Sequence, residues 1–263
     1  MTEKIGSLFS LDGSVSIVTG GSRGIGSTIS YRLAQAGSDV ATVHAGEYSP
    51  TPLVRSIKRL GRRIVDIPGA DVSEEISVKR AVNQVVTTLG RVDILVNNAG
   101  IYLHSLPEKT TAEEWDRVIG VNLRGAFLFS REVGRQMISA GRGGRIVNVA
   151  SIDVYQPERD FAHYDASKAG LVGLTRSLAL SWGRYGINVN AVAPGLVETP
   201  DLWKSARDRA NAFRRFSPLG RIPRAEDVAN LVLFLCSPAS AMITGQVVIV
   251  DAGATLTGYM GVK

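Results

Sequence analysis

The amino-acid sequence predicts an α/β fold, a doubly wound parallel sheet of seven strands with helices on both faces. Short apolar runs alternate with longer segments of helical periodicity along the whole chain, as in strands joined by crossover helices. Runs such as Ile94–Val96 and Ile146–Val149 are mostly apolar rather than alternating, which indicates strands buried on both faces. Because no Pro-, Ser- or Gly-rich linker interrupts this pattern, we expect residues 1–263 to form a single domain.

Residues that favour turns bound the predicted elements. The strands are expected at Ser14–Thr19, Asp39–Val43, Arg63–Ile67, Val92–Val96, Arg145–Val149, Ile187–Val192 and Val247–Val250. The helices are expected at Ile25–Gln35, Thr51–Leu60, Glu74–Leu89, Ala112–Ile119, Leu123–Ser139, Tyr164–Trp182, Asp201–Phe216 and Ala225–Leu235. Gly37, Gly61 and Gly90 follow helices, where glycine ends a helix without strain. Because ligands of parallel sheets bind at the carboxyl ends of the strands, every strand-to-helix turn is a candidate site.

Composition excludes several classes of protein. Hydrophobic residues make up 44% of the chain and charged residues 21%, so a disordered chain is excluded. A single cysteine, Cys236, excludes an intrachain disulfide and a cysteine-based zinc site. His44, His104 and His163 are too dispersed to suggest a metal site. No apolar run approaches ~18 residues and no signal-peptide core is present, so we expect a cytoplasmic protein without a membrane partner.

The chain is basic, with a net charge of +6 and a pI of about 9.6. Such a balance is compatible with nucleic acid, with an acidic ligand or with solvated helix faces. The basic groups are not interleaved with aromatic residues, as a groove for single strands would require. We therefore expect no nucleic-acid partner.

The turn after the first predicted strand is rich in glycine and reads Thr19-Gly20-Gly21-Ser22-Arg23-Gly24-Ile25-Gly26. Glycines allow a backbone to approach a pyrophosphate, and a helix N-terminus offers unpaired N–H groups and the positive end of its dipole. A tight structural turn is the alternative. The strand before the turn and the helix after it favour nucleotide binding.

Tyr164 and Lys168 are four residues apart and therefore share one face of their predicted helix. Hydride transfer to a carbonyl leaves an alkoxide that needs a proton, and a tyrosine whose pKa is lowered by a nearby ammonium can supply it. The spacing alone is common by chance, so an exposed pair on a surface helix is the alternative. The other motifs of the chain decide between the two.

Five motifs together resemble those of the short-chain dehydrogenase/reductase family. They are the glycine-rich turn, Asn97-Asn98-Ala99-Gly100 after the fourth strand, Ser151 after the fifth, Tyr164-x-x-x-Lys168 thirteen residues later, and Pro194-Gly195 after the sixth. Asn122 stands where that family keeps a catalytic asparagine. The resemblance spans roughly residues 11–253 and implies a Rossmann-type fold and an NAD(P)-dependent oxidoreductase. It divides the chain into a nucleotide-binding half, about 11–150, and a catalytic and substrate part, about 151–263.

The resemblance also implies roles for single residues. Tyr164 would act as the general acid or base, Lys168 would tune it and bind the nicotinamide ribose, and Ser151 would polarise the substrate carbonyl. Asn122 would hold a water that relays protons. Residues expected to contact the cofactor are Gly20, Ser22, Arg23, Gly24, Ile25, Gly26, His44, Asp71, Val72, Asn98, Ala99, Gly100, Tyr164, Lys168, Pro194, Gly195, Val197 and Thr199.

The choice of nicotinamide depends on the end of the second strand. NAD-specific folds carry an acid about ~20 residues past the glycines, where it binds the ribose 2′-hydroxyl. His44 stands at that position, and Arg23 lies where the family often places a residue that binds the 2′-phosphate. Both favour NADP(H). Glu47 could reach the ribose instead, so NAD(H) stays open.

The substrate is the least determined property. Asp153, Tyr155, His163 and Trp203 are expected to line the pocket, and their polarity favours a sugar, sugar acid or polyol. The turn Pro194-Gly195-x-x-Glu-Thr is also typical of 3-oxoacyl-carrier-protein reductases, which are the alternative. A non-catalytic nucleotide-binding regulator is a third hypothesis, disfavoured by the complete catalytic set.

Two larger features follow from the resemblance. Family members usually form tetramers through their two long helices, here Leu123–Ser139 and Tyr164–Trp182, so we expect a homotetramer or a dimer. The polar segment of about residues 196–217 is expected to form a substrate lid. Its arginines, among them Arg207 and Arg209, would bind an anionic substrate, unless they form only a solvated helix face.

Overall fold

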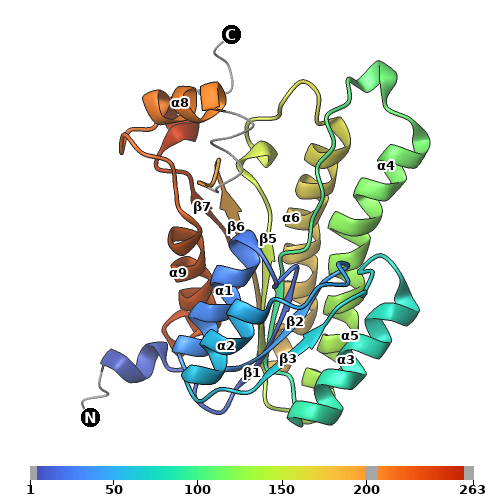
Figure 1. Ribbon diagram of the computed structural model, residues 1–263, viewed down its shortest axis with the longest axis vertical. Helices are drawn as coiled ribbons and strands as arrows, with labels where there is room; N and C mark the ends of the chain where they lie inside the picture. Colours follow the sequence, from blue (N-terminus) through green and yellow to red (C-terminus); the bar gives the residue numbers. More distant parts are fainter. Residues whose placement is uncertain (1–4, 199–206, 258–263) are drawn as a thin grey trace.

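The computed structural model describes residues 5–198 and 207–257, which form one twisted sheet with helices on both sides (Figure 1). The strands are β1 (Val15–Thr19), β2 (Asp39–Val43), β3 (Ile64–Ile67), β4 (Ile94–Asn97), β5 (Gly144–Val149), β6 (Ile187–Pro194) and β7 (Val247–Val250). They lie in the order β3-β2-β1-β4-β5-β6-β7, and every neighbouring pair is parallel. The predicted fold class is confirmed.

Helices connect the strands and cover both faces of the sheet. They are α1 (Gly24–Gln35), α2 (Thr51–Arg59), α3 (Glu75–Leu89), α4 (Ala112–Ile119), α5 (Gly125–Ala140), α6 (Ala162–Trp182), α8 (Arg207–Phe216) and α9 (Ala225–Cys236). Figure 1 shows α1, α2 and α9 on one side of the sheet and α3, α5 and α6 on the other. Helix α8 stands apart from both layers, beyond the carboxyl end of β6.

Two apolar cores, one on each face, hold the layers together. On the α1 and α9 side, Ile29, Leu33 and Val232 pack against the sheet. On the other side, Val85, Phe129 and Met137 do so. Strands β1 and β4 are buried along their whole length, which explains their lack of alternation in the sequence.

Several boundaries differ from the prediction, and three of the differences concern the elements around the site. The predicted helices Ala112–Ile119 and Leu123–Ser139 are joined by a π-helical turn, Gly120–Arg124, so the chain stays helical through Asn122. Helix α6 begins at Ala162, two residues earlier than predicted. Of the predicted helix Asp201–Phe216, residues 207–216 form α8, and the rest lies outside the described residues. Hydrophobic periodicity does not reveal one extra residue in a turn, because the apolar stripe continues beyond it.

Within residues 5–198 and 207–257, no helix is both long and apolar enough to cross a membrane. The same residues contain no group of three or more histidine, cysteine, aspartate or glutamate side chains that could hold a metal ion.

Candidate active site

The predicted site residues come from the carboxyl ends of four neighbouring strands. The glycine-rich turn follows β1, residues 98–100 follow β4, Ser151 follows β5, and Gly195 follows β6. Because β1, β4, β5 and β6 are adjacent in the sheet, these turns meet at one edge. This is the position at which doubly wound sheets bind their ligands.

The glycine-rich turn has the shape of a phosphate cradle. Gly20 and Gly24 adopt positive φ angles of 63° and 53°, which other residues rarely tolerate. A Cβ on Gly26 would collide with the carbonyl oxygen of Gly20, whereas one on Gly24 would meet no atom within 4 Å. The turn is therefore tight inside and open in front of α1. No side chain caps the first turn of α1, so its N–H groups suit an anion such as a pyrophosphate.

Asn98 holds this turn rather than projecting from it. Its Nδ2 donates to the carbonyl oxygens of Thr19 and Gly20 at 3.0 and 3.2 Å. The Thr19 hydroxyl in turn accepts the backbone N–H groups of Asn98 and Ala99. The contact of Asn98 with the adenosine ribose stays a prediction, and the side chain already has a structural role.

His44 lies at the end of β2 as predicted, and it is buried with a partner that the sequence did not indicate. Its Nε2 lies 3.0 Å from Asp66 Oδ1 on β3, which also accepts from the Thr42 hydroxyl at 2.7 Å. The Tyr48 ring covers the imidazole at a centroid distance of 5.1 Å. The Tyr48 hydroxyl pairs with Ser22 at 2.9 Å, which links this corner to the glycine turn.

Asp71 and Val72, predicted near the adenine, differ in exposure. Asp71 is exposed and accepts the N–H and hydroxyl of Ser73, whereas Val72 is buried against Gly125. Val197 lies just beyond β6 and is half-buried. Thr199 lies outside the described residues.

Lys168, Asn122 and Gly100 meet behind the glycine turn. A Cβ on Gly100 would lie 3.6 Å from Lys168 Nζ and 3.3 Å from Asn122 Oδ1, so these three residues lie close together. Lys168 is buried, and its Nζ donates to the Val149 carbonyl at 2.8 Å. Burial lowers the pKa of Lys168 to about 8.

The Asn122 side chain is occupied by protein partners. Its Oδ1 accepts from Ile101 N at 2.8 Å, and its Nδ2 donates to Ile101 O at 2.9 Å and to Ser167 Oγ at 3.0 Å. The π-helical turn places Asn122 so that it ties residue 101 to α6. Its predicted role in holding a relay water stays a prediction.

A second buried network lies beneath these residues, and sequence reasoning missed it. Asn97 and Asn148 are direct partners in the β4–β5 register, and Asn97 Nδ2 donates to Asn148 Oδ1 at 2.8 Å. Asn97 also donates to Ser130, and Asn148 donates to Thr175 on α6. The feature of the sequence that could have indicated this network is an asparagine near the end of each of two otherwise apolar strands.

Tyr164 lies beside Ser151, as predicted, but the expected lowering of its pKa by Lys168 is wrong for the chain alone. Burial raises the pKa of Tyr164, the carboxylates led by Asp153 raise it further, and a hydrogen bond with Ser151 opposes them. Lys168 Nζ is 5.5 Å from the centre of the Tyr164 ring and is committed to the Val149 carbonyl. The Tyr164 hydroxyl is therefore held in its protonated form.

Charged residues after Ser151 line the mouth of the site. Asp153 hydrogen-bonds to Ser151, Glu158 pairs with Arg209 of α8, and Asp160 accepts from His104 Nδ1 at 2.8 Å. Burial raises the pKa of Asp165 to about 7. Sequence reasoning missed the pairings of Glu158 and Asp160 because their partners are far away in the chain. The glutamate and arginine are 51 positions apart.

Aromatic rings form one wall of the mouth. Phe161 lies 5.8 Å from Tyr164 and 4.4 Å from His104 between ring centres, and Tyr102 lies 6.4 Å away. The Arg209 guanidinium lies 6.0 Å from the Phe161 ring.

The four predicted substrate residues have different surroundings. Asp153 reaches Ser151, and Tyr155 is exposed near it. His163 is fully buried, and its Nδ1 accepts the N–H of Tyr164 at 3.0 Å. A substrate contact for His163 is not supported, because the imidazole folds back onto its own helix. Trp203 lies outside the described residues.

Helix α8 packs over the turn that follows β6, in the position predicted for a lid. A Cβ on Gly195 would lie 2.8 Å from the ring of Phe213. The Arg209–Glu158 pair joins α8 to the segment before α6. The prediction that Arg209 awaits an anionic substrate is not supported, because this guanidinium already has a carboxylate partner.

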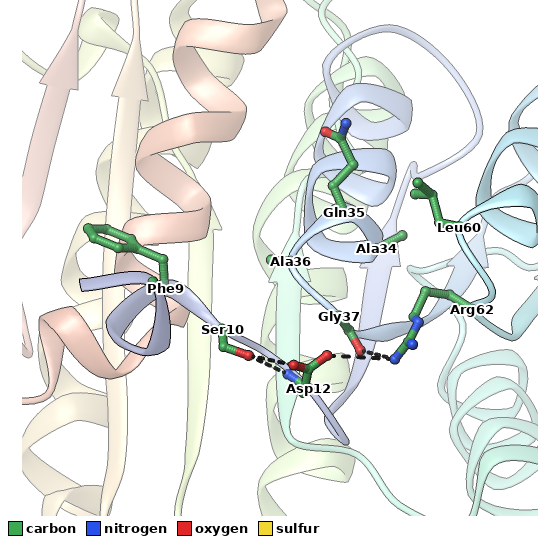
Figure 2. A pocket seen from close by; sticks show the side chains of 10 residues that line it. Phe9, Ser10, Asp12, Ala34, Gln35, Ala36, Gly37, Leu60 and Arg62 are labelled. Carbon is green, nitrogen blue, oxygen red and sulfur yellow. Dashed lines mark hydrogen bonds and ion pairs between the residues drawn. The ribbon is translucent and has the colours of Figure 1, made fainter. Parts of the chain in front are cut away.

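A hollow of about 340 Å³ lies at the opposite edge of the sheet (Figure 2). Its lining residues include Asp12, Gly37 and Arg62, which precede β1, β2 and β3. Arg62 donates to the Gly37 carbonyl at 3.0 Å and pairs with Asp12 (Figure 2). None of the predicted site residues is near it, so the edge with the glycine turn is the functional candidate.

Comparisons with known proteins agree with this geometry. A family model described as enoyl-(acyl carrier protein) reductase matches residues 20–255. The 3-oxoacyl-(acyl-carrier-protein) reductase of Thermotoga maritima is 39% identical over 253 residues, 94% of this chain and 99% of that protein. The D-threitol dehydrogenase of Mycolicibacterium smegmatis is 37% identical over 251 residues, 94% of this chain and 95% of that protein.

A solved structure extends the comparison to the fold. The gluconate 5-dehydrogenase of Burkholderia cenocepacia, in complex with NADP and tartrate, has a TM-score of 0.89 and is 32% identical, covering 96% of this chain and 99% of that one. Because the family model spans most of the sequence and these relatives span nearly all of it, the chain belongs to the short-chain dehydrogenase/reductase family of oxidoreductases.

Proposed function

We propose that this protein catalyses reversible hydride transfer between a nicotinamide cofactor and the carbon of a secondary alcohol or ketone. The supporting observation is the convergence of Ser151, Tyr164 and Lys168 at the edge of the sheet that also carries the glycine turn. When bound, the nicotinamide supplies or accepts the hydride. The chain supplies binding, orientation and the proton.

Each residue of this set has a distinct task. The Tyr164 hydroxyl gives its proton to the oxygen of the ketone in reduction and takes it back in oxidation. Its raised pKa keeps that proton in place before the reaction. Ser151 hydrogen-bonds the same substrate oxygen. Lys168 lies behind the Tyr164 ring and stabilises the phenolate that forms, while Asn122 holds residue 101 and α6 around it.

NADP(H) is the proposed cofactor. The end of β2 carries His44 instead of a carboxylate, and Arg23 is exposed at the entrance of the glycine turn. The Glu47 carboxylate lies beside Gly69, in the turn after β3. The Burkholderia gluconate 5-dehydrogenase was solved with NADP. Fluorescence titration with NADPH and NADH tests this choice, and tighter binding of NADH would contradict it.

The proposed substrate is a small polar molecule such as a sugar, a sugar acid or a polyol. The relatives named for threitol and gluconate support this class, as does the polar mouth of the site. Reduction of a 3-oxoacyl thioester is the second candidate. It is favoured by the Thermotoga relative and by the exposed arginines of α8, Arg207, Arg214 and Arg215, which could meet an acidic carrier.

One experiment separates these functions. Oxidation or reduction of the nicotinamide is followed by its absorbance across polyols, sugar acids and 3-oxoacyl thioesters. Turnover with polyols or sugar acids, lost in Tyr164→Phe, is the expected result. Turnover with thioesters alone would select the second candidate, and no turnover with any compound would contradict both.

We also propose a homotetramer. Large apolar side chains are exposed on the helices predicted to meet, with Phe127 of α5 at 41% and Leu180 of α6 at 88% exposure. Trp115 of α4 is 40% exposed. Light scattering at micromolar concentration should give four times the 28.1 kDa mass of the chain, and a monomer would contradict the proposal.

A further inference from the structure

The carboxylate of Asp153 lies next to the residues that perform the proposed reaction. The Asp153 N–H donates to Ser151 Oγ at 3.3 Å, and the Ser151 side chain also hydrogen-bonds to the Asp153 carboxyl group. The same carboxylate raises the pKa of both Tyr164 and Lys168. Among the described residues, it is the charged group that acts on all three.

On the basis of the proposed function, we propose that Asp153 determines the substrate class. The carboxylate accepts a hydrogen bond from a hydroxyl on the carbon next to the reacting one. The favoured substrates are therefore uncharged polyols and hydroxy ketones. Sugar acids whose carboxylate would occupy that position are disfavoured.

The reacting oxygen of the substrate binds between the hydroxyls of Ser151 and Tyr164. Asp153 is one hydrogen bond from Ser151, so the substituent on the neighbouring carbon is the part of the substrate that comes closest to it. Asp153 lies two residues after Ser151, in the short helical turn Ile152–Val154, and this turn keeps its carboxylate close to Ser151.

An ionised carboxylate can only accept hydrogen bonds, and a substrate hydroxyl can donate one. A substrate carboxylate has no proton to donate and is repelled by the charge. Burial raises the pKa of Asp153 above its ordinary value, and the Ser151 hydrogen bond and the cations Arg209 and Lys168 limit that rise.

Arg209 and His104, which lie against the Phe161 ring, already pair with Glu158 and Asp160. An anionic substrate would have to displace those partners. The rings of Phe161 and Tyr164 instead offer an apolar wall for the C–H groups of a polyol. The mouth therefore suits a neutral, hydroxyl-rich molecule.

The test compares matched substrates in the wild type and in three variants. Xylitol and xylonate differ in one terminal group, and cyclohexanol and its vicinal diol differ in one hydroxyl. The variants are Asp153→Asn, Asp153→Ala and, as a control that removes an exposed carboxylate outside the mouth, Glu108→Gln. Kinetic constants are measured for each pair, and NADPH affinity and thermal unfolding are measured to show that each variant is folded.

The wild type should prefer xylitol over xylonate by roughly tenfold or more in kcat/KM. Asp153→Asn should narrow that ratio through the KM of xylonate, and Asp153→Ala should also remove the preference for the vicinal diol. Glu108→Gln should leave both ratios unchanged. A wild type that prefers xylonate, a ratio untouched by Asp153→Asn, or an equal effect of Glu108→Gln would overturn this inference while the proposed function stands. No turnover with any of these alcohols would overturn both.

Discussion

The inner and outer parts of the site are built in opposite ways. The inner part, which we call the floor, consists of two pairs of neutral side chains, Asn97 with Asn148 and Asn122 with Ser167, joined by hydrogen bonds of 2.8 and 3.0 Å. The outer part, the mouth, consists of Asp153, Glu158, Asp160 and Asp165 with Arg209 and His104. The floor stands on strand ends and helices, whereas half of the mouth, Asp153, Glu158 and Asp160, stands on the segment between Ser151 and α6.

This difference suggests that the floor positions the catalytic residues and that the mouth selects the substrate. Buried hydrogen bonds between neutral groups are rigid, and Ser167 of the floor donates to the Tyr164 carbonyl at 2.7 Å, so the floor can hold Tyr164 in place. Charged groups at a partly exposed mouth attract or repel the substituents of a ligand, so they can discriminate between substrates. The floor then suits chemistry common to the family, and the mouth suits the choice of substrate. Four variants test this division.

Tyr164→Phe should have the largest effect, because it removes the proton donor and leaves the ring. We expect kcat to fall by roughly a thousandfold or more, within the range of general acid catalysis. The affinity for NADPH, measured by fluorescence, should change by less than about twofold, since no charge is lost. A variant that keeps half of its activity would exclude Tyr164 as the acid.

Lys168→Met should abolish turnover and yet stabilise the cofactor-free protein. The folded pKa of about 8 lies below the ordinary 10.5, so the unfolded chain binds more protons between these values and wild-type stability rises with pH across that window. Loss of the bond to the Val149 carbonyl offsets part of the gain, which we expect to be about 1–3 kcal/mol near neutral pH.

Urea unfolding of Lys168→Met, at neutral pH and again above the folded pKa, measures this gain. Lys79→Met is the matched control, because Lys79 is half-exposed and pairs with Glu75 on the surface of α3. If the Lys168→Met protein were less stable than the wild type at neutral pH, the hydrogen bonds of the buried ammonium would compensate fully for its lost hydration.

The floor and the mouth also differ in what the sequence reveals. Ser151, Tyr164 and Lys168 were predicted because a fixed interval carries them to one edge of the sheet. The Asn97–Asn148 hydrogen bond could not be predicted, because it depends on the register between β4 and β5, and no local sequence pattern reveals that register. The Arg209–Glu158 ion pair could be predicted only if the position of α8 were known, because charged residues on a helix have many possible partners.

Two differences from the prediction have a local cause. The start of α6 at Ala162 places His163 in the first helical turn, where its buried ring accepts the N–H of Tyr164. The pKa of Tyr164 is raised rather than lowered, because spacing on a helix shows proximity but not desolvation, and burial and the Asp153 carboxylate both raise it.

Glu158→Gln should have a moderate effect confined to substrate binding. It removes the charge that holds Arg209 and so loosens α8 over the mouth. A partly buried ion pair of about 1 kcal/mol corresponds to a rise in KM of roughly fivefold, with kcat nearly unchanged. Glu108→Gln, at an exposed position, is the control. A fall in kcat without a change in KM would mean that Glu158 supports the chemical step, as proposed for the floor, and not the binding of the substrate.

Asp165→Asn should have the smallest effect, on stability, and its sign depends on pH. The folded pKa of about 7 lies above the ordinary 3.8, so the stability that Asp165 contributes is present at low pH and is lost as pH rises through about 7. The asparagine avoids that loss and can still accept the Glu158 N–H, which Asp165 Oδ2 accepts at 3.2 Å.

The advantage of Asp165→Asn should therefore grow between about pH 4 and pH 7 and stay constant above, on the order of 1 kcal/mol after screening by solvent. Asp160→Asn is the opposite control. The hydrogen bond from His104 lowers the pKa of Asp160, so its stabilising effect is present above the ordinary value and lost in acid. Thermal unfolding across this pH range should show the two variants diverging from the wild type in opposite directions. Parallel curves would mean that solvent screens the carboxylates of the mouth so well that no single one changes the pH dependence of stability. The mouth would then contribute no more electrostatic destabilisation than the floor.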